Sequence, residues 1–177
     1  MTSGDNQQET ARITLEPAWI VGFTDGEGCF SVSLHRNERY AQRSFGWQIN
    51  PTFHLYQHRV HADVLEAVRR YFGVGRIVPK GHSSSVLTYS VQRRTDVAEV
   101  IVPFFVRHQL LVKDHDFRVF AEIVDGLRRG EHFTVDGFER IVRLAYSMNE
   151  HGKQRARKIE EILNGSSETA RQAYRLE

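Results

Sequence analysis

The stretch WIVGFTDGEG, residues 19–28, decides the fold, because it places the end of an apolar helix directly before two carboxylates. Pro17 favours the start of this helix, and the glycines at its far end favour its termination. Ala18, Gly22 and Gly26 are spaced by four and share one stripe of the helix. Small residues at that spacing let a second backbone approach closely. We therefore predict a buried helix whose small-residue stripe packs against another helix.

Asp25 and Glu27 stand at the unfavourable end of this helix. A carboxylate there meets the negative end of the helix dipole and loses roughly 0.3–1 kcal/mol. A divalent cation would offset that loss, since hard cations take carboxylate and backbone oxygen ligands. Solvated turn residues after a C-capping glycine explain these two residues at least as well, so the pair alone does not decide between the two readings.

The sequence that follows predicts an α+β domain. CFSVSLHRN and GWQINPTFHLYQ alternate apolar and polar residues, which is typical of half-buried strands. Pro51 cannot donate to a ladder, so the second strand is expected to be an edge or to carry a bulge there. A helix over HADVLEAVRRYFG, two strands in GRIVPKG and SSVLTYSVQRR, and helical segments from residue 96 onward complete the order α-β-β-α-β-β-α plus extra C-terminal helices.

The chain of 177 residues suits one domain. We expect a disordered lead-in over residues 1–14 without signal-peptide features, one domain over 15–165, and a tail over 166–177. The single cysteine, Cys29, excludes an internal disulfide, and no apolar run approaches the ~20 residues that span a bilayer.

The charge is unevenly distributed, although the net charge is only +2. Residues 31–94 hold ten basic residues against three acidic ones. Such an excess favours a polyanionic partner, and an ordinary solvated basic surface explains it about as well.

Residues 19–28 resemble the LAGLIDADG motif of homing endonucleases. Gly22 stands at the motif's inner glycine, Asp25 at its first acid, Glu27 at its second and Gly28 at its last glycine. The element order is similar to that family's αββαββα fold, in which a four-stranded antiparallel sheet forms a DNA-binding saddle. The resemblance covers roughly residues 15–165 and contains a single copy of the motif.

The resemblance implies a catalytic centre. Glu27 would bind a metal, with the carbonyl of Gly26 as a further ligand, and Mg²⁺ would be the ion, with Ca²⁺ or Mn²⁺ able to substitute. Gln57 would order the attacking water, and Lys113 would lie near the scissile phosphate. A second basic role falls on Arg59 or His61. No small-molecule cofactor is implied.

The resemblance also implies the assembly and the target. Family members with one motif copy act as homodimers, which places the dimer interface at Ala18, Trp19, Gly22, Phe23, Asp25 and Gly26. A symmetric dimer implies a pseudo-palindromic double-stranded DNA site. A β-ribbon fits the major groove, and strands of about nine residues span roughly nine base pairs, so the dimer would cover about 20 base pairs. It would cut one phosphodiester per strand and leave short 3′ overhangs. The outward sheet residues and the connecting loop would contact DNA: Ser31, Ser33, His35, Arg36, Arg39, Arg43, Gln48, Asn50, Thr52, His54, Arg76, Lys80, Thr88 and Gln92.

One alternative stays open at this stage. The same fold serves non-cleaving nucleic-acid binders, namely intron RNA maturases and DNA-binding regulators. The joint presence of Glu27, Gln57 and Lys113 favours cleavage. Arginine outnumbers lysine 20 to 4, which favours a GC-rich genome. We therefore expect a bacterial, cytoplasmic and nucleoid-associated protein rather than an organellar one. No membrane partner is expected.

Overall fold

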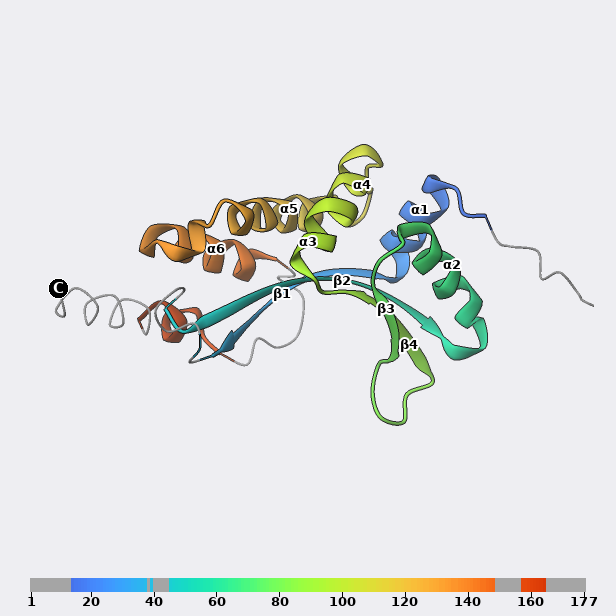
Figure 1. Ribbon diagram of the computed structural model, residues 1–177, viewed down its shortest axis with the longest axis horizontal. Coiled ribbons are helices and arrows are strands. Elements are labelled where there is room, and N and C mark those ends of the chain that lie inside the picture. The colour runs from blue at the N-terminus through green and yellow to red at the C-terminus, as the bar shows by residue number, and fades with distance from the viewer. Residues whose placement is uncertain (1–13, 38, 40–44, 149–156, 165–177) are drawn as a thin grey trace, which may run out of the picture.

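The structure is a computed structural model that describes residues 14–37, 39, 45–148 and 157–164. It has two layers, a four-stranded antiparallel sheet and a layer of helices that covers one face of that sheet (Figure 1). This arrangement confirms the α+β prediction.

Helix α1 passes into strand β1 with no intervening loop. α1 spans Pro17–Glu27 and β1 spans Gly28–Arg36. Gly28 has extended backbone angles, φ −88° and ψ 161°, and its N–H donates to the carbonyl of Thr24. The predicted end of the helix at these glycines is confirmed, and Gly28 caps it in an extended conformation. The helix ends because the chain turns directly into the sheet.

The sheet has the order β1-β2-β4-β3. Strand β2 spans Trp47–His58, β3 spans Arg76–Pro79 and β4 spans Val86–Val91. Pairing between β2 and β4 begins at Phe53 and Val91, whereas Pro51 pairs only with Val32 of β1. Pro51 thus lies where β2 is locally an edge. A strand that is interior along the rest of its length can therefore hold a proline.

The remaining elements form the helical layer. Gly73, with φ +70°, ends α2 in the left-handed conformation that glycine adopts readily. The helical region predicted from residue 96 begins at Arg94 and contains a π-helical turn before Pro103. The elements are η2 (Arg59–His61), α2 (Ala62–Phe72), α3 (Arg94–Asp96), η3 (Val97–Ile101), α4 (Val102–Arg107), α5 (Asp114–Arg128), η4 (Glu131–Phe133) and α6 (Val135–Ser147).

The core lies between the two layers and is rich in aromatic rings. Phe30 of β1 is 1% exposed and contacts Phe53, Phe105, Phe117 and Phe120 at ring-centroid distances of 5.2 to 5.3 Å. Tilted and edge-on aromatic pairs of this kind add to the stabilisation from area burial. The Phe30–Phe53 pair of the β1–β2 ribbon is thereby fixed against the helices, and none of the described helices covers the opposite face of the sheet. Across the described ranges, no helix has the length and apolarity needed to cross a membrane.

His132 makes the fold sensitive to acid. Its side chain is buried in η4, its Nδ1 atom has no hydrogen-bond partner among the described residues, and it lies near the charge of Arg94. Burial, with a smaller contribution from Arg94, lowers the pKa of His132 from 6.5 to about 4. The folded protein therefore holds this imidazole neutral, whereas the unfolded chain protonates it near pH 6.5.

We predict that the free energy of unfolding falls as the pH is lowered through this window, because the unfolded state then binds more protons. The His132 contribution should amount to about 2 kcal/mol between about pH 7 and about pH 5. Urea unfolding at the two pH values measures it. His132→Phe should remove this part of the pH dependence, while His115→Phe, at an exposed site, should retain it. Equal slopes in the wild type and His132→Phe would contradict the prediction.

Candidate nucleic-acid interface and catalytic centre

The small-residue stripe of α1 is uncovered. Ile20 and Thr24 face the core and are 0% exposed, whereas Ala18, Gly22 and Gly26 lie on the opposite, exposed side. A Cβ atom built on Gly22 or Gly26 would meet no heavy atom within 4 Å. The described part of a single chain thus supplies no helix for this stripe.

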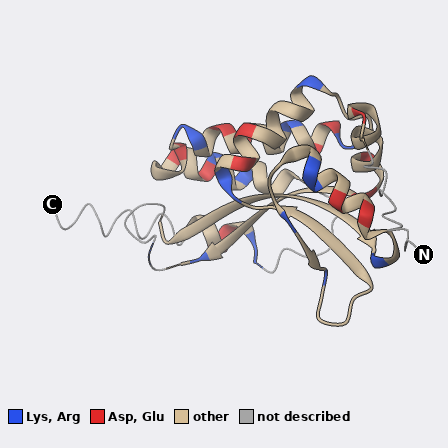
Figure 2. Ribbon diagram, turned by 45° about the vertical axis from the view of Figure 1, so that its right-hand side comes forward, with Lys and Arg blue, Asp and Glu red and all other residues tan. Residues whose placement is uncertain are grey.

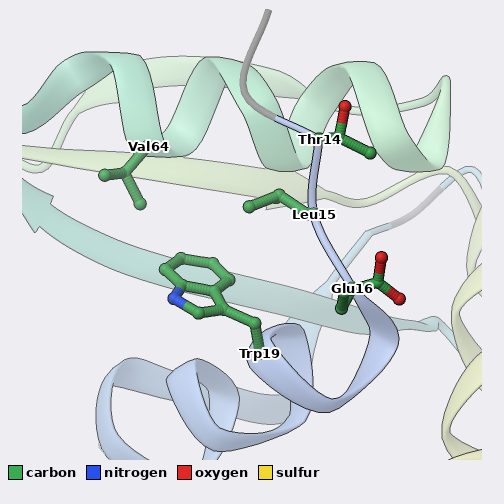
Figure 3. A pocket seen from close by; sticks show the side chains of 5 residues that line it. All are labelled: Thr14, Leu15, Glu16, Trp19 and Val64. Atoms are coloured by element: carbon green, nitrogen blue, oxygen red, sulfur yellow. The ribbon is translucent and has the colours of Figure 1, made fainter.

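Trp19 and Phe23 continue this uncovered side towards α2. Their rings stack with a centroid distance of 4.9 Å, and Trp19 remains 42% exposed. Trp19 points into a hollow of about 290 Å³ between α1 and α2, which Leu15 and Val64 also line (Figure 3). The surface around the stripe is therefore both apolar and recessed.

The two acids of the motif have different environments. The Asp25 carboxylate accepts hydrogen bonds from three consecutive backbone N–H groups, those of residues 111–113, at 2.9, 3.2 and 3.0 Å. Amides of the same chain therefore compensate this carboxylate for its unfavourable place at the helix C-terminus, and a cation is not required for that purpose. Glu27 is exposed at the last position of α1. It is the acid that remains available to an external ligand.

Lys113 is brought to these acids from 86 residues farther along the chain. It directly precedes α5, and its Nζ donates to the backbone carbonyl of Asp25. Its charge also acts on Cys29, two residues beyond Glu27. The structure thus holds Lys113 at the end of α1, on the residue two positions before Glu27.

Gln57 reaches the same end of the sheet. Leu55 pairs with Gly28, so Gln57 lies two residues past the start of β1, on the face that carries Leu55. Its Oε1 accepts from the backbone N–H of His58 at 2.8 Å. No hydrogen bond to Glu27 or Lys113 is found for it within the described residues, so the structure places it near the centre without fixing its role.

The two candidates for a second basic role lie in η2. Arg59 is anchored to the β3–β4 hairpin, because its backbone N–H donates to the Ser85 carbonyl at 2.7 Å and its Nη2 to the Ser84 carbonyl at 3.1 Å. His61 is exposed. Arg59 is thus the more constrained of the two cations.

The uncovered face of the sheet carries the predicted polar set. Residues that pair directly across an antiparallel ladder share a face, and the register joins Ser31 to Thr52, Ser33 to Asn50 and His35 to Gln48. The strands bear few charges, whereas the helices carry both signs (Figure 2). Burial lowers the pKa of His54, which favours a neutral imidazole that can both donate and accept.

Some predicted contact residues occupy other positions than expected. Thr52 and Thr88 are only 7% and 6% exposed, and Thr88 is a short side chain with a paired strand on each side. Arg36 is the last residue of β1 rather than part of the loop, and it shares the face of its partner Trp47, which the helices cover. The loop residue Arg39 is exposed, and Arg43 lies outside the described residues.

The basic residues of the second hairpin are held in place by neighbours. Arg76 donates through Nη2 to the Oε1 of Gln92 at 3.1 Å. The Nζ of Lys80 lies 4.4 Å from the ring centroid of Tyr56, a cation–π contact on the uncovered face. The sequence analysis missed Tyr56, although extending the alternation of β2 by two residues beyond His54 would have found it.

The residues of one chain can supply part of a metal site, but not its full set of ligands. In the portions of the chain that are described, no three His, Cys, Asp or Glu side chains gather to hold an ion. An exposed carboxylate and a nearby backbone carbonyl are oxygen donors of the type that Mg²⁺ and Ca²⁺ accept. A single chain offers too few of them, so further ligands would come from phosphate oxygens, water or a second copy.

The sheet thus has one open polar face with arginine and lysine on its second hairpin, and an exposed carboxylate follows the lysine-bound end of α1, which is typical of a candidate nucleic-acid interface with a candidate hydrolytic centre. The profile of the LAGLIDADG endonuclease family matches residues 20–124. The chain belongs to this family.

The relatives agree with that assignment. The chain is 33% identical over 153 residues to the homing endonuclease I-ApeII of Aeropyrum pernix, covering 84% of this chain and 89% of the relative. It is 28% identical over 136 residues to the probable intron-encoded endonuclease 2 of Neurospora crassa, covering 76% of this chain. Our chain spans only 29% of that fungal protein.

Solved structures share the fold. The archaeal intron-encoded homing endonuclease I-Vdi141I, solved in complex with DNA, has a TM-score of 0.79 and 28% identity over 87% of this chain and 96% of its own. I-SmaMI, bound to an uncleaved DNA target in the presence of calcium ions, has a TM-score of 0.75 and 27% identity, covering 85% of this chain and 49% of its own.

We predict that Gly28→Ala loosens the junction on which the centre depends. A Cβ at this position would lie 2.5 Å from the Thr24 carbonyl oxygen and 2.6 Å from the Thr24 Cγ2 atom. The overlap should lower the free energy of unfolding by about 1–3 kcal/mol. Urea unfolding measures it. Gly81→Ala is the matched control, because its Cβ would meet nothing within 4 Å; equal stabilities of the two variants would contradict the prediction.

Proposed function

We propose that this chain is a homing endonuclease that hydrolyses double-stranded DNA at a specific site with a divalent metal, preferentially Mg²⁺. The observation that carries the proposal is the bond of Lys113 to Asp25 at the end of α1, two residues before the exposed carboxylate of Glu27 and next to the start of β1. A protein that only binds nucleic acid has no need of an exposed carboxylate facing phosphates, since it would repel them.

The residues have distinct roles in this proposal. Glu27 and the Gly26 carbonyl would hold the ion. When bound, the ion would polarise the phosphate and lower the pKa of a water molecule bound to it. The Lys113 ammonium stabilises negative charge that develops on the phosphate. Gln57 orients the attacking water, and Arg59 or His61 contributes the second cation. Calcium in the I-SmaMI complex supports an ion at this kind of centre.

The sheet would read the DNA. Strand β2 has 12 residues, which at ~3.3 Å each spans ~40 Å and exceeds the ~30 Å needed for roughly nine base pairs. Asn and Gln amides pair bidentately with adenine and arginine with guanine, so Gln48, Asn50 and Arg76 are suited to base contacts. Two chains would then cover a pseudo-palindromic site of about 20 base pairs. One cut per strand with short 3′ overhangs follows from the family resemblance.

The proposal extends to where the protein acts. Relatives are named intron-encoded, which supports an origin of this chain in an intron. A bacterial cytoplasmic setting, expected from the arginine excess, stays a prediction.

We predict that Glu27→Gln abolishes cleavage while it preserves DNA binding. The substitution keeps the shape of the side chain but removes the anionic oxygen that a hard cation requires. A library of double-stranded DNA is first enriched by binding and then incubated with Mg²⁺, and cut molecules are sequenced. Glu99→Gln, on the exposed side of η3, is the control and should cut like the wild type.

Two outcomes decide between cleavage and the alternative. A wild type that binds a defined site and never cuts it would establish the non-cleaving binder. RNA that competes for the enriched site more strongly than DNA would favour the maturase form of that alternative.

We infer that the active unit is a homodimer built on the uncovered stripe of α1. The stripe of Ala18, Gly22 and Gly26, together with the flanking Trp19, Phe23 and Asp25, would pack against the same elements of a second copy. Each chain would then bring one Glu27 to the symmetry axis, which supplies the ligands that a single chain lacks. A two-fold dimer requires a self-complementary patch, and a stripe of small residues satisfies that requirement.

We predict that Gly22→Leu yields a monomer. A Cβ at residue 22 would meet no heavy atom of the described chain within 4 Å, so folding should be preserved, but the larger side chain would hold two helices apart at their closest approach. Sedimentation at micromolar concentration measures the mass, and thermal unfolding checks the fold. Glu99→Leu is the control and should remain dimeric. A wild type that is a monomer and binds DNA one-to-one would refute the dimer.

A further inference from the structure

The loop that delivers Lys113 has no regular secondary structure. Residues 108–113 join α4 to α5 without helix or strand. Leu110 anchors the loop in the core at 1% exposure, whereas Leu111 and Val112 are 87% and 77% exposed. The side chains just before Lys113 therefore do not hold it, and the position of this segment must be set by its backbone.

The backbone of this segment is held by Asp25. Oδ2 accepts from the N–H of Leu111 at 2.9 Å, and Oδ1 accepts from those of Val112 and Lys113 at 3.2 and 3.0 Å. Lys113 returns a bond through Nζ to the carbonyl of Asp25. The Asp25 side chain thus binds the backbone N–H of Lys113, and the Asp25 backbone carbonyl binds the Lys113 ammonium.

These contacts engage both oxygens of the carboxylate. Hydrogen bonds to an ionised acceptor are about twice as strong as neutral ones, and three converging amides form a nest for an anion. Asp25 is therefore satisfied within the chain and has no unengaged oxygen directed at an external ion. Its neighbour Glu27, two residues later, is left for that purpose.

We propose that Asp25 is the positioning residue of Lys113, acting on catalysis by holding the loop that carries the lysine and not by binding metal. This inference rests on the proposed function, since it assumes that Lys113 acts on the scissile phosphate. It assigns the two acids of the motif separate roles: Asp25 positions the Lys113 ammonium, and Glu27 faces the metal and the substrate. The contact also makes the end of α1 and the start of α5 one unit.

A double-mutant cycle on the single-turnover cleavage rate tests the proposal. Asp25→Ala loses all three amide bonds and should slow cleavage by about 100-fold, the order expected when a catalytic group is displaced by ~1 Å. Asp25→Asn can accept at most two of these bonds with its single oxygen and should slow cleavage by about 10-fold. In a Lys113→Ala background, both substitutions should change the remaining rate by less than about 2-fold, since their effect passes through the lysine.

Two measurements separate positioning from other roles. The Mg²⁺ concentration that gives half-maximal rate should be unchanged in Asp25→Asn, and the affinity for DNA should be retained. Hydrogen exchange of the amides of residues 111–113 should speed up in both Asp25 variants while exchange in α6 stays the same. Asp136→Asn, on an exposed site of α6, is the matched control and should behave as wild type in every assay.

The outcomes are distinct. Effects of Asp25 and Lys113 substitutions that multiply in the double variant would overturn the proposal, as would a raised Mg²⁺ requirement, which would make Asp25 a metal ligand. Unchanged amide exchange in Asp25→Ala would overturn it without reference to cleavage. A wild type that cuts no target while the amides respond as expected would instead overturn the proposed function, and with it the catalytic meaning of the contact.

Discussion

The loop-free passage from α1 into β1 is the constraint on which the rest of the structure depends. Helix and strand meet at Glu27 and Gly28, and the N–H of Gly28 is used by the Thr24 carbonyl. Because no loop intervenes, the last turn of an apolar helix sits at the edge of the sheet and carries its carboxylates there. A linker of even a few residues would let the acids move independently of the sheet.

This constraint explains how one chain can combine opposite requirements. The inner face of the sheet needs large apolar groups, and Phe30 follows Glu27 by only three residues to enter the aromatic core. The outer face needs neutral donors and acceptors, which Ser31 and Ser33 begin to supply on alternate positions. The period of two in β1 therefore separates packing from recognition within a few residues of the acids.

Local patterns predicted the fold well because each of them acts over a few residues. Alternation in β1 and β2 identified both strands and their polar face. The Thr134 hydroxyl caps α6 in the same local manner, because it accepts from the N–H of Gly137 at 3.2 Å. The charge excess of residues 31–94 was less informative about position, since Arg69 and Arg70 lie on α2 and Arg94 donates to the Ile49 carbonyl. Charge in a segment does not specify the face on which its side chains emerge.

What the sequence could not predict depends on contacts between distant segments. No local pattern relates Asp25 to amides 86 to 88 residues away. From the sequence, a bound cation was therefore a possible compensation for the unfavourable interaction of this carboxylate with the helix dipole. Burial of Thr88 likewise depends on β2 and β3 lying on either side of β4. The family resemblance assigned the metal to Glu27 and the dimer interface to Asp25, but nothing in the sequence showed the contact of Asp25 with residues 111–113. Amides of the same chain engage the Asp25 carboxylate, whereas Glu27 stays exposed at the end of α1 and is the acid of the motif that an external cation can reach.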